Sequence, residues 1–130
     1  MRTLRDERGL ATLETVLSVV ILVPLLFGVI AFGVLFQRWL AAETVAAHGA
    51  RYAGELGGDE PALRAFISRE LSAAGIDPQH VAVEVQPARV AWREPIRVTV
   101  RSDEPIVLPF ALATTVTLRA TAIARGEVNR

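Results

Sequence analysis

The sequence predicts an α+β protein in which one long N-terminal helix crosses a membrane and continues into a small water-facing domain. Three observations support this prediction. Residues 15–36 carry no charged side chain, residues 61–74 place apolar side chains at helical spacing, and apolar residues alternate with polar ones after residue 80. We therefore expect a second short helix and an antiparallel sheet of three to four strands beside the extension of the first helix.

The uncharged run from Thr15 to Phe36 is long enough to span a bilayer. A helix of this length measures about 33 Å, and a hydrocarbon core is about 30 Å thick. Sixteen of the 22 positions are Leu, Ile, Val or Phe, which favours insertion by at most about 5 to 10 kcal/mol. A cleaved secretory signal would have a shorter apolar core and an Ala-x-Ala site. We interpret the run as a membrane span, with a kink expected at Pro24.

Arginines on the two sides of the span indicate its orientation. Arg2, Arg5 and Arg8 precede it, and Arg38 and Arg51 follow it. Because positive charge is enriched on the cytoplasmic side, the N-terminus is expected in the cytoplasm and the C-terminal domain outside it. The prediction is a single-pass protein of the cytoplasmic membrane.

Composition argues against several classes of function. The net charge is zero, and arginines are scattered among acidic residues, so no nucleic-acid-binding surface is expected. The chain has no cysteine, and His48 and His80 lack partners at metal-binding spacing. Nucleophile and phosphate-loop motifs are also lacking. We expect no enzyme activity, cofactor, metal or small-molecule substrate.

The residues just before the span are Gly9, Leu10 and Glu14. Residues 1–9 are charged and without apolar periodicity, which predicts a disordered segment or a removable leader. Glu14 can lie at headgroup level, where water and the helix N-terminus favour an acid. Alternatively, cleavage between Gly9 and Leu10 would place a new amine within reach of Glu14, i to i+4 along one helical face, or of Glu14 in a neighbouring subunit.

Gly9 followed by an apolar helix with Glu14 resembles the prepilin-peptidase site of type IV pilins and pseudopilins. The longer stretch from Arg8 to Ala53 resembles the TadE-like family of Tad (tight adherence, Flp-type) pilus assembly proteins. The shared features are Arg8-Gly9, Glu14, Pro24-Leu25-Leu26, Phe27-Gly28 and the small-residue run ending in Ala50-Arg51. Pro109-Phe110 with residues 115–125 also resembles the closing strand of TadE-like domains.

This resemblance implies a pilin-like fold with a leader (1–9), a transmembrane helix with its extension (10–56) and an extracytoplasmic domain (57–130). It implies a minor pilin or pseudopilin, cleaved after Gly9, whose Glu14 offsets the amine of the mature chain during assembly. The expected partners are the membrane, the prepilin peptidase, other pilin or pseudopilin subunits and the Tad assembly machinery. Incorporation into an extracellular pilus would follow. The alternative is a permanently membrane-anchored binding or scaffold module.

After Arg38 and Trp39, which suit the membrane interface, small residues recur every fourth position. These are Ala42, Ala46, Ala50 and Gly54. They either allow close approach to another helix or pack on the chain's own sheet, and we expect the second use, as in other amphipathic helices of small domains. Gly57-Gly58 is expected to end the helix.

The second helix is predicted over residues 61–74, with Asp59 or Glu60 as its cap and Pro61 in its first turn. Its apolar face comprises Leu63, Phe66, Ile67 and Leu71.

Strands are predicted at residues 81–86, 96–101 and 115–124. Residues 103–105, Asp-Glu-Pro, predict a turn. The sequence leaves open whether residues 90–92 form a separate strand.

Overall fold

The structure, a computed structural model, describes residues 3–108 and 112–128, with the backbone alone for residues 3–8 and 112. Its elements are α1 (Thr3–Leu56), α2 (Pro61–Ala73), the 3-10 helix η1 (Pro78–His80), β1 (Val81–Gln86), β2 (Pro95–Leu108) and β3 (Leu112–Arg125). The predicted fold class is confirmed: a long N-terminal apolar helix, a second short helix and a three-stranded antiparallel sheet.

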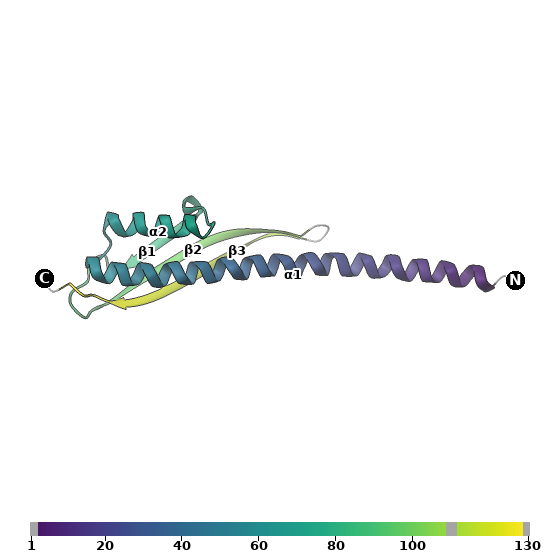
Figure 1. Ribbon diagram of the computed structural model, residues 1–130, viewed down its shortest axis with the longest axis horizontal. Coiled ribbons are helices and arrows are strands. Elements are labelled where there is room, and N and C mark those ends of the chain that lie inside the picture. Colours follow the sequence, from purple (N-terminus) through teal and green to yellow (C-terminus); the bar gives the residue numbers. More distant parts are fainter. Residues whose placement is uncertain (1–2, 109–111, 129–130) are drawn as a thin grey trace.

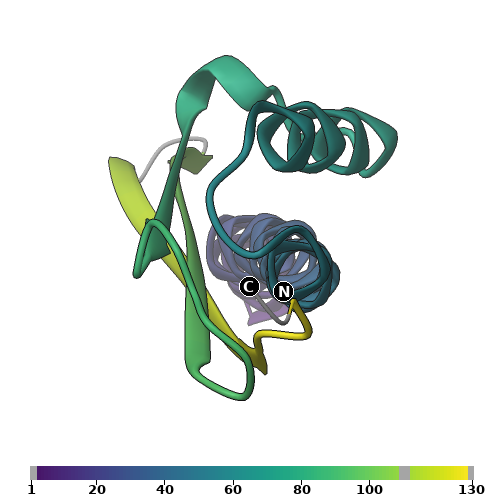
Figure 2. The ribbon, with the colours of Figure 1, turned by 90° about the vertical axis from the view of Figure 1, so that its left-hand side faces the viewer.

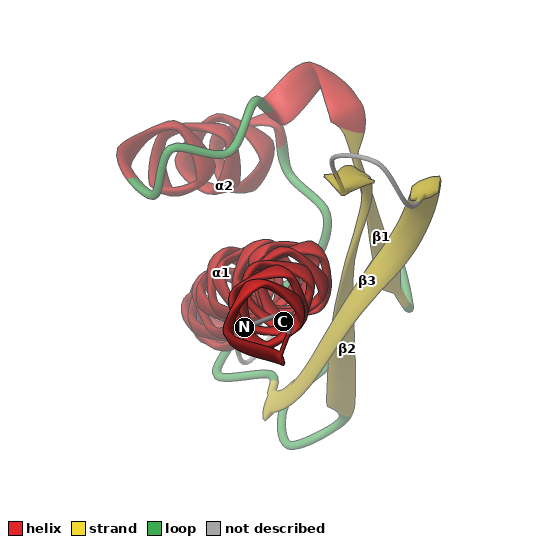
Figure 3. Cartoon of the chain, turned by 90° about the vertical axis from the view of Figure 1, so that its right-hand side faces the viewer, coloured by secondary structure: helices red, strands yellow, loops and turns green. Residues whose placement is uncertain are grey.

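One long rod, α1, organises the molecule. Figure 1 shows the other elements gathered along its C-terminal half, while its N-terminal half projects alone. Viewed along the rod, the sheet covers one side of α1 and α2 lies against another side (Figures 2 and 3). The C-terminal half of α1 is therefore a central part of the domain.

The sequence correctly predicts where α1 ends but not where it begins. The end at Leu56 is confirmed: Gly57 has a φ of 81°, and the N–H groups of Gly57 and Gly58 both donate to the Ala53 carbonyl at 3.0 Å. At the other end, the backbone is helical from Thr3, so the expectation of disorder in residues 1–9 is wrong for residues 3–9. A leader function for this segment stays a prediction.

The small-residue face of α1 packs on the chain's own domain. Ala42, Ala46 and Ala50 are at most 1% exposed. A Cβ atom at Gly49 would lie 3.1 Å from Ile67 of α2 and 3.6 Å from Val98 of β2. Since α1, α2 and the sheet all meet at this glycine, the expectation that this face packs internally is confirmed.

The short helix α2 begins at Pro61, as predicted. Glu60 occupies the cap position, but its side chain makes no capping hydrogen bond. Asp59 instead accepts two hydrogen bonds from Arg64, at 3.0 and 2.6 Å. These hydrogen bonds, and then the charge of Asp59, raise the pKa of Arg64. Glu60 is therefore the cap residue by position, one of the two predicted alternatives. Asp59, the other alternative, lies outside the helix and pairs with Arg64.

The sheet has the order β1-β2-β3, and β2 and β3 form a hairpin of two 14-residue strands. The predicted turn at residues 103–105 is wrong, because all three residues lie in β2 and pair with β3. Proline is tolerated there because β1 ends opposite Ser102, so Pro105 lies where β2 has an open edge.

The segment between β1 and β2 contains no further strand. Residues 90–92 form no strand, and an isolated bridge joins Gly58 to Arg89 just before them. Pro109 and Phe110 lie outside the described residues.

Candidate functional site

The candidate site is the N-terminal half of α1, most of whose large apolar side chains are exposed. Between Leu10 and Leu40 the exposed ones range from 37% exposed, at Trp39, to 70% exposed, at Leu13. Val23 and Leu35 are half-buried. The helix from Gly9 to Leu56 is long and apolar enough to cross a membrane. A continuous apolar surface of this size is unfavourable in water and marks contact with lipid or protein.

At the N-terminal end of this surface, Gly9 and Leu10 lie within the helix. A Cβ atom added at Gly9 would meet no atom within 4 Å. Glycine inside a helix costs about 1 kcal/mol relative to alanine. The packing of the chain therefore gives no reason for a glycine at this position, and its explanation lies outside the fold.

Glu14 lies one helical turn after Leu10, and its side chain is exposed. Within the residues that the structure describes, Glu14 makes no hydrogen bond or ion pair, whereas the neighbouring Thr15 hydroxyl donates to the Ala11 carbonyl at 2.9 Å. A carboxylate at the edge of a membrane span is unfavourable without compensation. The described part of the chain supplies none.

Pro24 lies within α1, and the helix continues on both sides of it. Figure 1 shows α1 without a sharp bend. The kink expected at Pro24 stays a prediction.

Aromatic rings gather at the C-terminal end of the apolar surface. The ring centroids of Phe32 and Phe36 are 6.3 Å apart, and those of Phe36 and Trp39 are 5.8 Å apart. Aromatic rings beside an arginine are typical of the boundary between membrane and water. The interfacial position of Arg38 and Trp39 stays a prediction.

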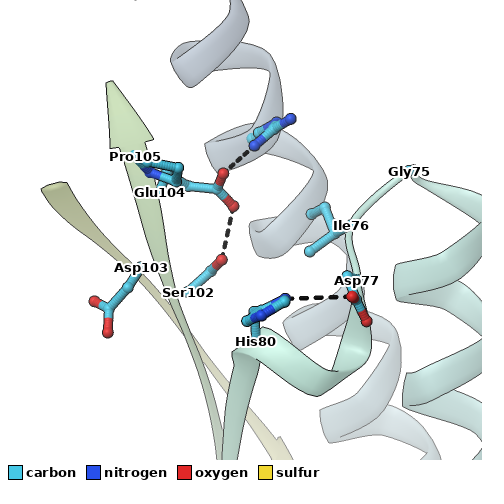
Figure 4. A pocket seen from close by; sticks show the side chains of 9 residues that line it. Gly75, Ile76, Asp77, His80, Ser102, Asp103, Glu104 and Pro105 are labelled. Carbon is cyan, nitrogen blue, oxygen red and sulfur yellow. Dashed lines mark hydrogen bonds and ion pairs between the residues drawn. The ribbon is translucent and has the colours of Figure 1, made fainter. Parts of the chain in front are cut away.

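A polar cluster that was not predicted from the sequence lies at this level. Arg38 donates from Nη1 to Oε2 of Glu104, whose residue is only 6% exposed, and the Ser102 hydroxyl donates to Oε1 of Glu104 at 2.7 Å. Figure 4 shows Ser102 and Glu104 side by side on β2. The cluster joins α1 to the hairpin at the C-terminal end of the apolar surface.

A signal for this cluster was present in the alternation of β2. Ile96, Val98 and Val100 are buried, and the same strand face continues through Ser102 to Glu104. An acid on a buried face needs a cationic partner. Interpreting Pro105 as the end of a turn concealed this continuation.

The two histidines lie elsewhere. His80 faces Asp77 at 3.2 Å across one end of a cavity of about 300 Å³ (Figure 4), and His48 of α1 faces Glu70 of α2 at 3.2 Å. Residues 3–108 and 112–128 contain no group of three or more metal-ligating side chains. The expected lack of a metal, cofactor and catalytic activity stays a prediction.

Comparison with protein families gives a match that coincides with this site. Residues 9–51 match the family model described as TadE-like protein. No curated protein and no solved structure is significantly similar to the chain. The match begins at Gly9 and covers the apolar surface and part of the buried extension of α1. The segment from Gly9 to Arg51 is TadE-like, which confirms the resemblance to the Tad pilus assembly proteins.

Proposed function

We propose that the protein is a minor pilin or pseudopilin of a Tad/Flp-type pilus, cleaved after Gly9 by a prepilin peptidase and assembled through the apolar part of α1. The TadE-like segment and the apolar helix indicate a membrane-anchored, Tad pilus-associated protein. One observation carries the finer proposal: Glu14, one turn after Leu10, is exposed and has no partner in the described chain.

The proposed role of Glu14 is electrostatic. Cleavage after Gly9 creates an ammonium group on Leu10, four residues before Glu14 and on the same helical face. In a bundle of apolar helices an unpaired charge is costly, whereas a paired one is tolerated. Glu14 would therefore offset the amine of its own chain or of a neighbouring subunit.

The size of the domain favours a minor or accessory subunit. Residues 57–130 follow the helix and form α2 and the sheet, whereas the resemblance implies that a Flp-type major pilin is very short. On this proposal the N-terminus is cytoplasmic, the domain is extracytoplasmic, and the chain is not an enzyme. Its partners are the prepilin peptidase, other pilin subunits and the Tad machinery.

Processing is tested by intact mass and N-terminal sequencing of the protein from membranes of its native host. The wild-type chain should begin at Leu10, and Gly9→Ala should retain the leader. Gly28→Ala is a matched control, because a Cβ atom meets nothing within 4 Å at either glycine. Cleavage of Gly9→Ala, or an uncleaved wild-type chain beside an active peptidase, would contradict the proposal.

Assembly is tested by Glu14→Gln, which removes the charge and keeps the shape. We expect normal membrane insertion and reduced piliation in the native host. Glu55→Gln is the control, since Glu55 is an exposed acid at the other end of the same helix. Unchanged piliation in Glu14→Gln would favour the alternative, a permanently anchored binding or scaffold module.

A further inference from the structure

The distal end of the β2-β3 hairpin runs beside the apolar surface of α1. Figure 1 shows the hairpin extending along α1 toward its N-terminal half, past the end of α2. A groove of about 220 Å³ is lined by Pro105, Ile106 and Val107 of the hairpin and by Ala31, Val34 and Leu35 of α1. The ion-paired Arg38 and Glu104 also line it. Ala31, Val34 and Leu35 belong to the run that is expected to lie in the membrane.

This end of the hairpin differs in composition from the rest of the domain. The sequence carries no charged side chain from Pro105 to Leu118, between Glu104 and Arg119. Val107 is 72% exposed although it is apolar. We define the hairpin end as the described residues 105–108 and 113–118.

The depth of the hairpin end in the bilayer follows from its position along α1. Ala31 precedes Arg38 by seven residues, which corresponds to about 10 Å along α1. The headgroup region on one side of a bilayer is about 5 to 8 Å thick. With Arg38 and Trp39 at the water-facing edge of the headgroup region, the level of Ala31 lies about 2 to 5 Å beyond that region, so the hairpin end reaches from the headgroups into the upper acyl region.

We propose that the hairpin end is a second membrane contact, which rests on the lipid headgroup and upper acyl region beside α1. The partner is lipid because this surface is continuous with the apolar surface of the span and carries no charge. The contact is interfacial, since strand edges with unpaired backbone groups do not occur in lipid-exposed hydrocarbon. Pro105, which lacks an N–H group, lies on the open edge of β2 in this region.

The proposal rests on membrane anchoring through α1. One experiment tests the hairpin contact and the anchoring separately. Because the chain has no cysteine, single cysteines can be introduced by Val107→Cys, Val20→Cys and Ile123→Cys and labelled with an environment-sensitive NBD fluorophore. Val20 is 61% exposed in the apolar run, and Ile123 is 59% exposed at the opposite end of the hairpin. Thr115→Cys, opposite Pro105, provides a second label at the hairpin end.

The labelled full-length proteins are placed one copy per nanodisc of phosphatidylcholine and phosphatidylglycerol that contains nitroxide lipids. At positions 107 and 115 we expect blue-shifted emission and stronger quenching by a nitroxide near the headgroup than by one deep in the acyl chain. The label at position 20 should be quenched by the deep nitroxide, and the label at position 123 by neither.

Three results would overturn the proposal. Labels at 107 and 115 that behave like the label at 123, while the label at 20 is quenched, would refute the hairpin contact and leave anchoring intact. A label at 20 without quenching would refute anchoring itself. Protection of position 107 that occurs only in vesicles with many copies would assign this surface to contact between chains.

Discussion

Removal of the Arg38 side chain is expected to weaken the attachment of the hairpin to α1. Glu104 is 6% exposed and has two partners, Arg38 and the Ser102 hydroxyl. Breaking a fully buried ion pair costs about 3–5 kcal/mol. Because the Arg38 side chain is 44% exposed, water can replace part of the interaction, and we expect Arg38→Ala to lower the free energy of unfolding by about 2 kcal/mol.

Glu104→Gln should cost less than Arg38→Ala, although both remove the same ion pair. The amide keeps the hydrogen bond from Ser102 and buries no charge, and the exposed Arg38 can turn into water. We expect a loss below about 1 kcal/mol. The asymmetry arises because the carboxylate is the buried member of the pair.

The assay is urea unfolding of the full-length protein in detergent micelles, followed by circular dichroism. Hydrogen exchange locates the effect, which should be concentrated in β2 beyond Ser102. Arg101→Ala is the control, since Arg101 is an exposed arginine on the same strand. Equal losses for Arg38→Ala and Glu104→Gln, or a loss for Arg38→Ala no larger than that for Arg101→Ala, would refute the reasoning.

Three further substitutions test the packing of the domain in the same assay. Gly54→Ala should lower the free energy of unfolding by about 1–3 kcal/mol, because its Cβ atom would lie 2.5 Å from a backbone carbonyl oxygen at the end of β3; Gly28→Ala should cause no loss. Ile67→Ala should lower the free energy of unfolding by about 2–5 kcal/mol, since this side chain is 1% exposed. A loss under about 1 kcal/mol would show that neighbouring side chains fill the cavity. Asp59→Ala should cost less than about 1 kcal/mol, because the Arg64 side chain is 57% exposed; a larger loss would mean that the pair fixes the start of α2.

Hydrophobic periodicity correctly predicted the helices and strands that are determined by residues close together in the sequence. The four-residue spacing from Ala42 to Gly54 correctly indicated a helix face packed on the domain, and Gly57 correctly marked its end. The alternation at residues 81–86 predicted β1 at its observed bounds. In each case the residues that decide the structure are near one another in sequence.

Most of the wrong or incomplete predictions depend on contacts between residues that are far apart in the sequence. The turn predicted at residues 103–105 is wrong because only the length of β1 determines that β2 has a free edge at Pro105, where proline is tolerated. The partner of Glu104 is 66 residues away in Arg38, so no local pattern identifies it. The sequence offers Asp59 or Glu60 as the cap of α2, and only the pairing of Asp59 with Arg64 shows that Glu60 takes this position.

The continuity of α1 bears on the choice between a pilin-like subunit and a display module. A single helix passes from the exposed apolar surface to the buried segment between Ala42 and Ala53 without a break. The domain core is therefore built on the same rigid element that enters the membrane, and Arg38 adds a second attachment at their junction. A module that only displays a binding domain gains from a flexible linker, whereas a helical assembly requires that the packing of the apolar helices fix the orientation of every domain. Since the helix and the domain cannot reorient independently without breaking the core, the architecture favours the assembled subunit.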